Sequence, residues 1–119
     1  MNTRKTAVEG ENSAVEYLKG IGYGIIERNY RCPAGEIDVV ARDKGIVVFV
    51  EVKTRNSTQF GMPEESVNAA KRRKILLSAK FWMSAHGRDC KKGCRFDVIS
   101  VLRGEVRHTV NAFDADCLV

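Results

Sequence analysis

The segment Ile46–Thr54 constrains the fold most strongly, because two opposite charges interrupt an otherwise apolar run. A stretch this rich in Val, Ile and Phe, preceded by Gly45, predicts a buried β-strand. Side chains alternate across a strand, so Glu51 and Lys53 point to the same face. Charged groups on a buried strand are costly unless they are paired or bind a metal ion. The chain must therefore fold in a way that satisfies this pair.

A second carboxylate, Asp38, interrupts the preceding apolar segment, which spans residues 36–42 and predicts another strand. Asp43-Lys44-Gly45 joins the two strands, and its glycine suits the left-handed position of a bulged hairpin. The sequence leaves the register open. A plain three-residue loop would place Asp38 opposite Val50, whereas a bulge or a four-residue loop would place it opposite Glu51. The second register would bring two carboxylates together and predicts a metal site.

The side chains of Asp38 and Glu51 suit Mg²⁺ or Mn²⁺, which prefer hard oxygen ligands and retain several waters. A bound metal lowers the pKa of its water, and Lys53 would orient that water or stabilise charge developing on a phosphate. The Val52 carbonyl can add an oxygen ligand. Glu11, on the apolar stripe of the first predicted helix, could hold a second metal or bind the first through water. It could instead reach solvent or pair with an arginine. The alternative is a structural ion-pair cluster in which Lys53 balances Glu51, which leaves Asp38 unexplained.

The hydrophobic periods and turn residues predict the order α-β-β-β-α-β-β in a single domain of residues 1–119. A helix between the third and fourth strands implies a crossover joining parallel neighbours. The predicted fold class is therefore α/β, with a mixed central sheet flanked by helices. Helices are expected at 3–19 and 64–86, and strands at 23–28, 36–42, 46–54, 95–102 and 106–111, with an irregular stretch at 29–35 and a loop at 56–63.

The net charge of +5 is unevenly distributed along the chain. Between positions 71 and 95 there are nine Lys or Arg residues and one acidic residue. This asymmetry favours a polyanionic partner such as nucleic acid, although a solvated helix face is the simpler alternative. The residues expected to contact phosphates are Lys71, Arg72, Arg73 and Lys74.

No apolar run approaches about 18 residues, so neither a membrane span nor a secretory signal is expected, and a cytoplasmic location is predicted. The spacing of His86, Cys90 and Cys94 could ligate zinc, but a fourth ligand is missing. Reduced cytoplasmic thiols are the simplest expectation for these residues and for Cys32 and Cys117, with a Cys90–Cys94 link as the alternative.

Asp38, a gap of twelve residues and then Glu51-Val52-Lys53 resembles the PD-(D/E)xK nuclease signature, with Ile37 in place of the proline. The longer pattern resembles the bacterial YraN-like family, a small group related to the archaeal Holliday junction resolvases. The resemblance covers nearly the whole chain. The matching residues are Gly10-Glu11, Tyr17-Leu18, Arg28-Asn29, Gly35-Glu36-Ile37-Asp38, Phe49-Val50-Glu51-Val52-Lys53-Thr54-Arg55, Lys71 and Arg95-Phe96-Asp97.

This resemblance implies a restriction-endonuclease-like αβββαβ core, a divalent metal, and phosphodiester hydrolysis on DNA. It assigns metal binding to Asp38 and Glu51, catalytic support to Lys53, and an auxiliary acidic role to Glu11. The expected function is a Mg²⁺- or Mn²⁺-dependent endonuclease acting on branched or structured DNA. A nucleic-acid-binding module that cuts poorly, or only with a partner, is the alternative. Because related resolvases act as two-fold dimers, a homodimer is also possible.

Overall fold

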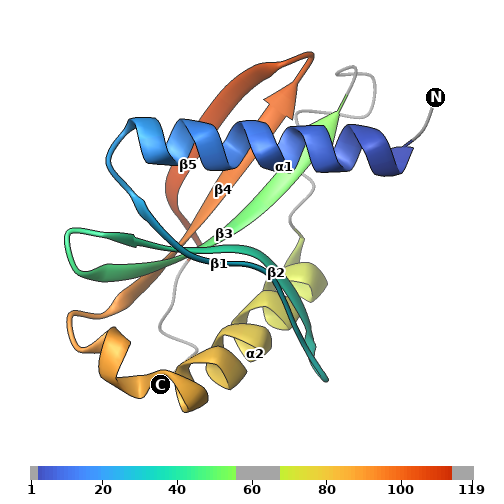
Figure 1. Cartoon of the computed structure of the whole chain (residues 1–119). Coiled ribbons are helices and arrows are strands. Elements are labelled where there is room, and N and C mark those ends of the chain that lie inside the picture. Colours follow the sequence, from blue (N-terminus) through green and yellow to red (C-terminus); the bar gives the residue numbers. More distant parts are fainter. Residues whose placement is uncertain (1–2, 56–67, 114–119) are drawn as a thin grey trace.

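The computed structural model describes residues 3–55 and 68–113, which form a five-stranded sheet between two helices (Figure 1). The strands are ordered β1-β2-β3-β4-β5. The β3–β4 pair is parallel and the other three pairs are antiparallel, which confirms the predicted mixed sheet and α/β class. The elements are α1 Thr3–Gly20, β1 Gly24–Cys32, β2 Gly35–Asp43, β3 Ile46–Arg55, α2 Ala69–Ala85, the 3₁₀ helix η2 Gly87–Cys90, β4 Cys94–Leu102 and β5 Glu105–Phe113.

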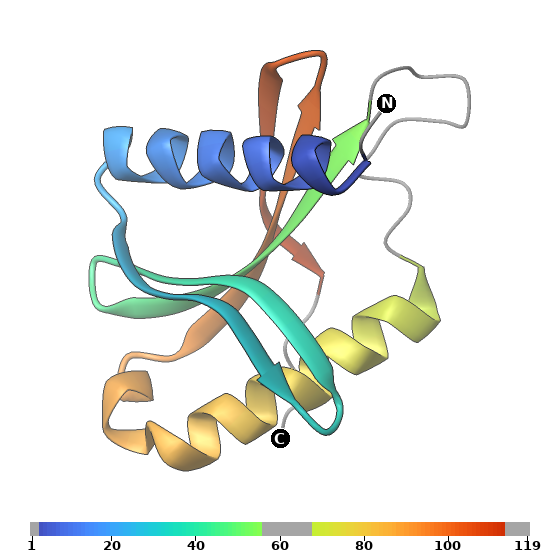
Figure 2. The ribbon, with the colours of Figure 1, turned by 45° about the vertical axis from the view of Figure 1, so that its right-hand side comes forward.

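The two helices cover opposite faces of the sheet, each over its own apolar cluster (Figure 2). Leu18 of α1 packs with Val48 and Val50, whereas Trp82 of α2 packs with Phe49 on the other face. The alternation of residues 47–50 between the faces is the period of a strand buried on both sides. On the same period, Glu51 follows Phe49 on the α2 face.

The turn between β2 and β3 contains two residues, Lys44 and Gly45, with φ angles of 52° and 89°. Asp43 pairs directly with Ile46. Positive φ at both central residues defines the tight hairpin turn whose twist matches that of the strands. Neither connection considered from the sequence is formed, the plain three-residue loop or the bulged or four-residue loop, but the register is the one in which Asp38 lies opposite Glu51.

The stretch 29–35, expected to be irregular, continues the β1–β2 hairpin instead. Tyr30 pairs with Ile37 and Cys32 pairs with Gly35, so only residues 33–34 form the turn. Tyr30 and Ile37 both pack against the α2 cluster, and this burial favours continued pairing over an open loop. The hairpin tip reaches α2, where a Cβ added at Gly35 would lie 3.3 Å from the Ser78 hydroxyl (Figure 2).

Helix α2 begins at Ala69 and not at the expected Glu64. Asn68 is extended, with φ −82° and ψ 178°, and its side chain accepts a hydrogen bond from the Lys71 backbone N–H at 3.0 Å. This is an N-cap, which satisfies a donor of the first turn that has no partner within the helix. The predicted loop at 56–63 and residues 64–67 lie outside the described residues. Neither α1 nor α2 is long and apolar enough to cross a membrane.

Candidate metal and nucleic-acid site

The site forms where β2 separates from β3. The last pair of the β2–β3 ladder is Val39 with Val50, and continuing this register places Asp38 opposite Glu51. Beyond that point the Asp38 carboxylate Oδ2 accepts a hydrogen bond from the Val52 backbone N–H at 2.8 Å. The Asp38 carboxylate therefore accepts the hydrogen bond of a β3 N–H group beyond the last β2–β3 backbone pair.

Glu51 is 9% exposed and lies beside two lysines. The ammonium groups of Lys53, from the same strand, and Lys71, from α2, each lie 3.3 Å from Glu51 Oε1. The site thus combines two carboxylates from adjacent strands with one lysine from β3 and one from α2. Lys53 was expected here from the strand period, and Lys71 was expected to flank the site and contact phosphates.

Burial makes both carboxylates of this pair hard to ionise, and the charge of Glu51 adds to the effect at Asp38. Burial, followed by the negative charge of Glu51, raises the pKa of Asp38 to about 8, although the Val52 N–H opposes the rise. Burial also raises the pKa of Glu51, and the positive charge of Lys71 opposes that rise. The pair therefore favours a bound proton or an added cation.

Glu11 lies at the edge of this pair. Its Oε1 accepts hydrogen bonds from Arg28 Nη2 at 3.2 Å and from Asn29 Nδ2 at 3.0 Å. The negative charge of Glu11 still contributes to the raised pKa of Asp38. The structure therefore brings Asp38, Glu51 and Lys53 together and holds Glu11 nearby through the arginine pairing that the sequence left open.

Gly10 sets the position of this part of α1. A Cβ added there would lie 2.0 Å from the Thr54 hydroxyl, so the helix backbone packs directly on the end of β3. Because only glycine permits this approach, the Gly10-Glu11 pair places a carboxylate next to the site.

The oxygen donors at this site are of the type that Mg²⁺ and Mn²⁺ prefer. No group of three or more His, Cys, Asp or Glu side chains within residues 3–55 and 68–113 is arranged to hold a metal ion. The residues present fit a Mg²⁺ or Mn²⁺ site with two carboxylate ligands, completed by a backbone oxygen and water. Such a ligand set is common for these hard cations. In a strand, the N–H and C=O of one residue point to the same edge, so the Val52 carbonyl faces the side on which Asp38 lies.

Within the described residues, His86, Cys90 and Cys94 do not form a group that could hold zinc. His86 stacks on Trp82, with ring centroids 4.2 Å apart. Cys32, Cys90 and Cys94 are free thiols, so the alternative Cys90–Cys94 link is not formed.

The basic cluster of α2 is divided between the interior and the surface. Lys71 turns inward to Glu51, and the Arg72 guanidinium lies 5.6 Å from the centre of the Phe113 ring. Arg72, Arg73 and Lys74 are all exposed. Lys71 therefore contacts the Glu51 carboxylate, and the other three members of the expected phosphate-binding group lie on the surface.

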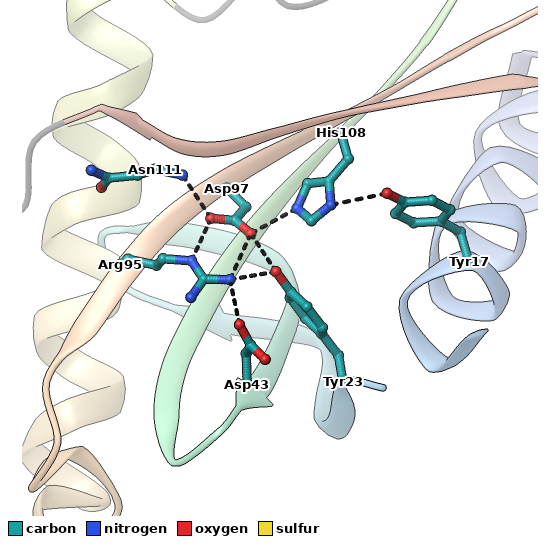
Figure 3. A network of polar contacts seen from close by, with 7 residues as sticks. All are labelled: Tyr17, Tyr23, Asp43, Arg95, Asp97, His108 and Asn111. Carbon is teal, nitrogen blue, oxygen red and sulfur yellow. Dashed lines mark hydrogen bonds and ion pairs between the residues drawn. The ribbon is translucent and has the colours of Figure 1, made fainter. Parts of the chain in front are cut away.

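A second polar cluster, not foreseen as a unit, lies on the α1 face of the sheet (Figure 3). Asp97 is fully buried and accepts from Arg95 Nε at 3.0 Å and from the Asn111 backbone N–H at 2.9 Å. Its other oxygen lies 2.7 Å from His108 Nε2, whose Nδ1 is 3.2 Å from the Tyr17 hydroxyl. The cluster ties α1 and β5 to β4.

Arg95 extends this cluster to the β2–β3 turn through Asp43, at 3.1 Å, and to the Tyr23 hydroxyl. Burial alone would raise the pKa of Asp97, but hydrogen bonds from His108 and Arg95 lower it. Burial and the charge of Asp97 raise the pKa of Tyr23 to about 12. The signal in the sequence was the same as for Glu51 and Lys53, namely two charges two residues apart on a buried strand.

Comparison with known proteins places the chain in a family. Residues 10–101 match the profile described as "Uncharacterised protein family UPF0102". A UPF0102 protein of Persephonella marina is 50% identical over 109 residues, which cover 91% of this chain and 92% of the relative. A UPF0102 protein of Lachnoclostridium phytofermentans is 44% identical over 115 residues, which cover 97% and 98%. The chain therefore belongs to the UPF0102 family, the family that its resemblance to YraN-like proteins indicated.

Proposed function

We propose that this protein is a metal-dependent DNA endonuclease that hydrolyses phosphodiester bonds. The observation that carries the proposal is the pairing of the half-buried Asp38 with the buried Glu51, with the Lys53 ammonium 3.3 Å from Glu51. An ordinary stable core would not place two carboxylates side by side, because burial and the charge of Glu51 raise the cost of ionising Asp38. A divalent cation bound between them removes this cost.

In this proposal Asp38 and Glu51 hold the cation, and the Val52 carbonyl supplies a further oxygen. Bound Mg²⁺ or Mn²⁺ provides a water of lowered pKa and neutralises charge on the phosphate. Lys53 stabilises the charge that develops on the phosphate oxygens. Glu11 has an auxiliary role: it fixes Arg28 at the edge of the site and adds negative charge near the cation.

The proposed substrate is branched or structured DNA. The exposed Arg73 and Lys74 on α2 supply phosphate contacts, and a two-fold dimer would present one such site to each of two symmetric strands. This choice of substrate, and of a homodimer, follows the resemblance to junction resolvases.

A second function is favoured by the contacts of Glu51. Two lysines already neutralise its carboxylate, so the fold and the basic helix can be retained for binding nucleic acid without cleavage. Under this alternative the carboxylate–lysine cluster stabilises the fold, and cutting is weak or requires a partner.

A cleavage panel separates the two functions. Single-stranded, duplex, flap and four-way-junction DNA are incubated with the protein in Mg²⁺, Mn²⁺ or chelator, and the products are resolved on denaturing gels. We expect metal-dependent cuts on a branched substrate that are lost in Asp38→Asn, Glu51→Gln and Lys53→Met. DNA binding without cleavage on every substrate and with either metal would favour the binding module.

A further inference from the structure

The two lysines that contact Glu51 Oε1 are held very differently. Lys53 projects from the central strand β3 and its side chain is 12% exposed, whereas Lys71 projects from the first turn of α2 and is 38% exposed. Both ammonium groups are 3.3 Å from the same oxygen. Lys71 is therefore the one that can leave Glu51 by rotating its side chain into solvent, without moving the sheet.

A divalent cation on Glu51 would compete with this arrangement. Three positive groups would then surround one carboxylate, and each repels the others over a few ångströms in a partly buried site. The carboxylate oxygen also has few lone-pair positions to share between an ammonium donor and a metal. Binding of a metal to Glu51 thus favours release of the more exposed lysine.

The surroundings of Lys71 favour its transfer to a phosphate. The first turn of α2 contains no acidic residue, and Arg73 and Lys74 lie exposed within the next turn. The positive end of the helix dipole repels an ammonium group at this position unless an anion is beside it. Glu51 is that anion in the structure, and a DNA phosphate can replace it.

We propose that Lys71 is a positioning residue that exchanges partners. It neutralises Glu51 until a divalent metal binds there, and it then contacts a DNA phosphate, so metal binding and DNA binding strengthen each other. This proposal rests on the proposed function, because it requires a metal at Glu51 and a phosphate next to α2. It differs from a simple phosphate contact in that Lys71 must weaken metal binding when DNA is absent.

The test measures Mn²⁺ affinity by isothermal titration calorimetry, with no DNA present, for the unmodified protein and for Lys71→Met. We expect Lys71→Met to bind Mn²⁺ about two- to fivefold more tightly, the fold-change that corresponds to losing a half-exposed ion pair. Lys80→Met removes the same charge from an exposed position farther along α2 and is expected to leave Mn²⁺ affinity unchanged. Lys71→Gln, which keeps a neutral hydrogen-bond donor, should also bind Mn²⁺ more tightly.

The second readout is the coupling between the two ligands. Ca²⁺ affinity is measured with and without a saturating concentration of DNA that is not cut in Ca²⁺. The DNA should tighten Ca²⁺ binding by the unmodified protein and by Lys80→Met, and this effect should be lost in Lys71→Met. If Lys71→Met binds Mn²⁺ as tightly as the unmodified protein or more weakly, the inference is overturned, but the proposed metal site is not affected. If Glu51→Gln binds Mn²⁺ as the unmodified protein does, the metal is not at Glu51, and the proposed function fails together with the inference.

Discussion

Replacing Asp38 with Asn should make the protein more stable at alkaline pH in the absence of metal. The substitution keeps an oxygen that can accept the Val52 N–H and removes the charge that burial and Glu51 disfavour. The folded-state pKa of Asp38 is raised from 3.8 to about 8. Because one pKa unit corresponds to about 1.4 kcal/mol, the upper limit of the effect on the free energy of unfolding is about 6 kcal/mol.

The sign follows from proton binding. Between about pH 4 and pH 8 the unfolded chain has lost the Asp38 proton while the folded protein retains it, so raising the pH lowers the free energy of unfolding. Above about pH 8 both states are ionised and the loss is complete. Asp38→Asn has no such proton, so its stability should vary less across this window.

The assay is urea denaturation in chelator at pH 5 and pH 8.5 for the two proteins. We expect similar stability at pH 5 and a more stable Asp38→Asn protein at pH 8.5. If Asp38 were instead the structural partner of a buried cation, the substitution would cost about 3–5 kcal/mol at pH 8.5. That result would refute the argument from charge repulsion.

Three further predictions concern the rest of the molecule. Asp97→Asn, the matched change on the other face, should destabilise the protein by about 3–5 kcal/mol at pH 7 in urea denaturation, because it leaves the half-buried Arg95 without its fully buried anion. Because the pKa of Asp97 is lowered, the stability that this carboxylate contributes should be lost only as the pH falls below about 4. Loss of this stability nearer to neutral pH would contradict the prediction. Replacing Arg73 and Lys74 with Gln should flatten the salt dependence of DNA binding by roughly two units of slope, and an unchanged slope would place the DNA elsewhere. Gly10→Ala should cost about 1–3 kcal/mol in urea denaturation because its Cβ would clash with β3, whereas Gly20→Ala, which meets nothing within 4 Å, should not.

The sequence predicts the strands better than their connections. The charged pair on an apolar strand identified β3 and, with it, the buried position of Glu51 and Lys53. The Lys44-Gly45 turn was misjudged because lysine rarely adopts a positive φ, and its conformation follows from the twist of the hairpin. The irregular stretch expected at 29–35 was wrong because pairing of Tyr30 with Ile37 is stabilised by α2, which is distant in the sequence.

The candidate site shows the same limit. Strand alternation placed Glu51 and Lys53 on one face, but it left open the register that brings Asp38 opposite Glu51. Strand alternation could not predict the ion pair between Lys71 and Glu51, because this contact depends on where α2 begins and how it crosses the sheet. The pairing of Glu11 with Arg28 was left open for a similar reason, as it joins a helix to a strand.

Thermal unfolding with and without metal tests the central claim most directly. A metal that binds the native state through Asp38 and Glu51 raises its stability by mass action, by about 2.7 kcal/mol at a hundredfold excess over Kd. We predict that Mg²⁺ or Mn²⁺ raises the Tm of the unmodified protein, and that Asp38→Asn and Glu51→Gln lose most of this shift. No shift in the unmodified protein, or an equal shift in the two variants, would contradict a metal site at these carboxylates.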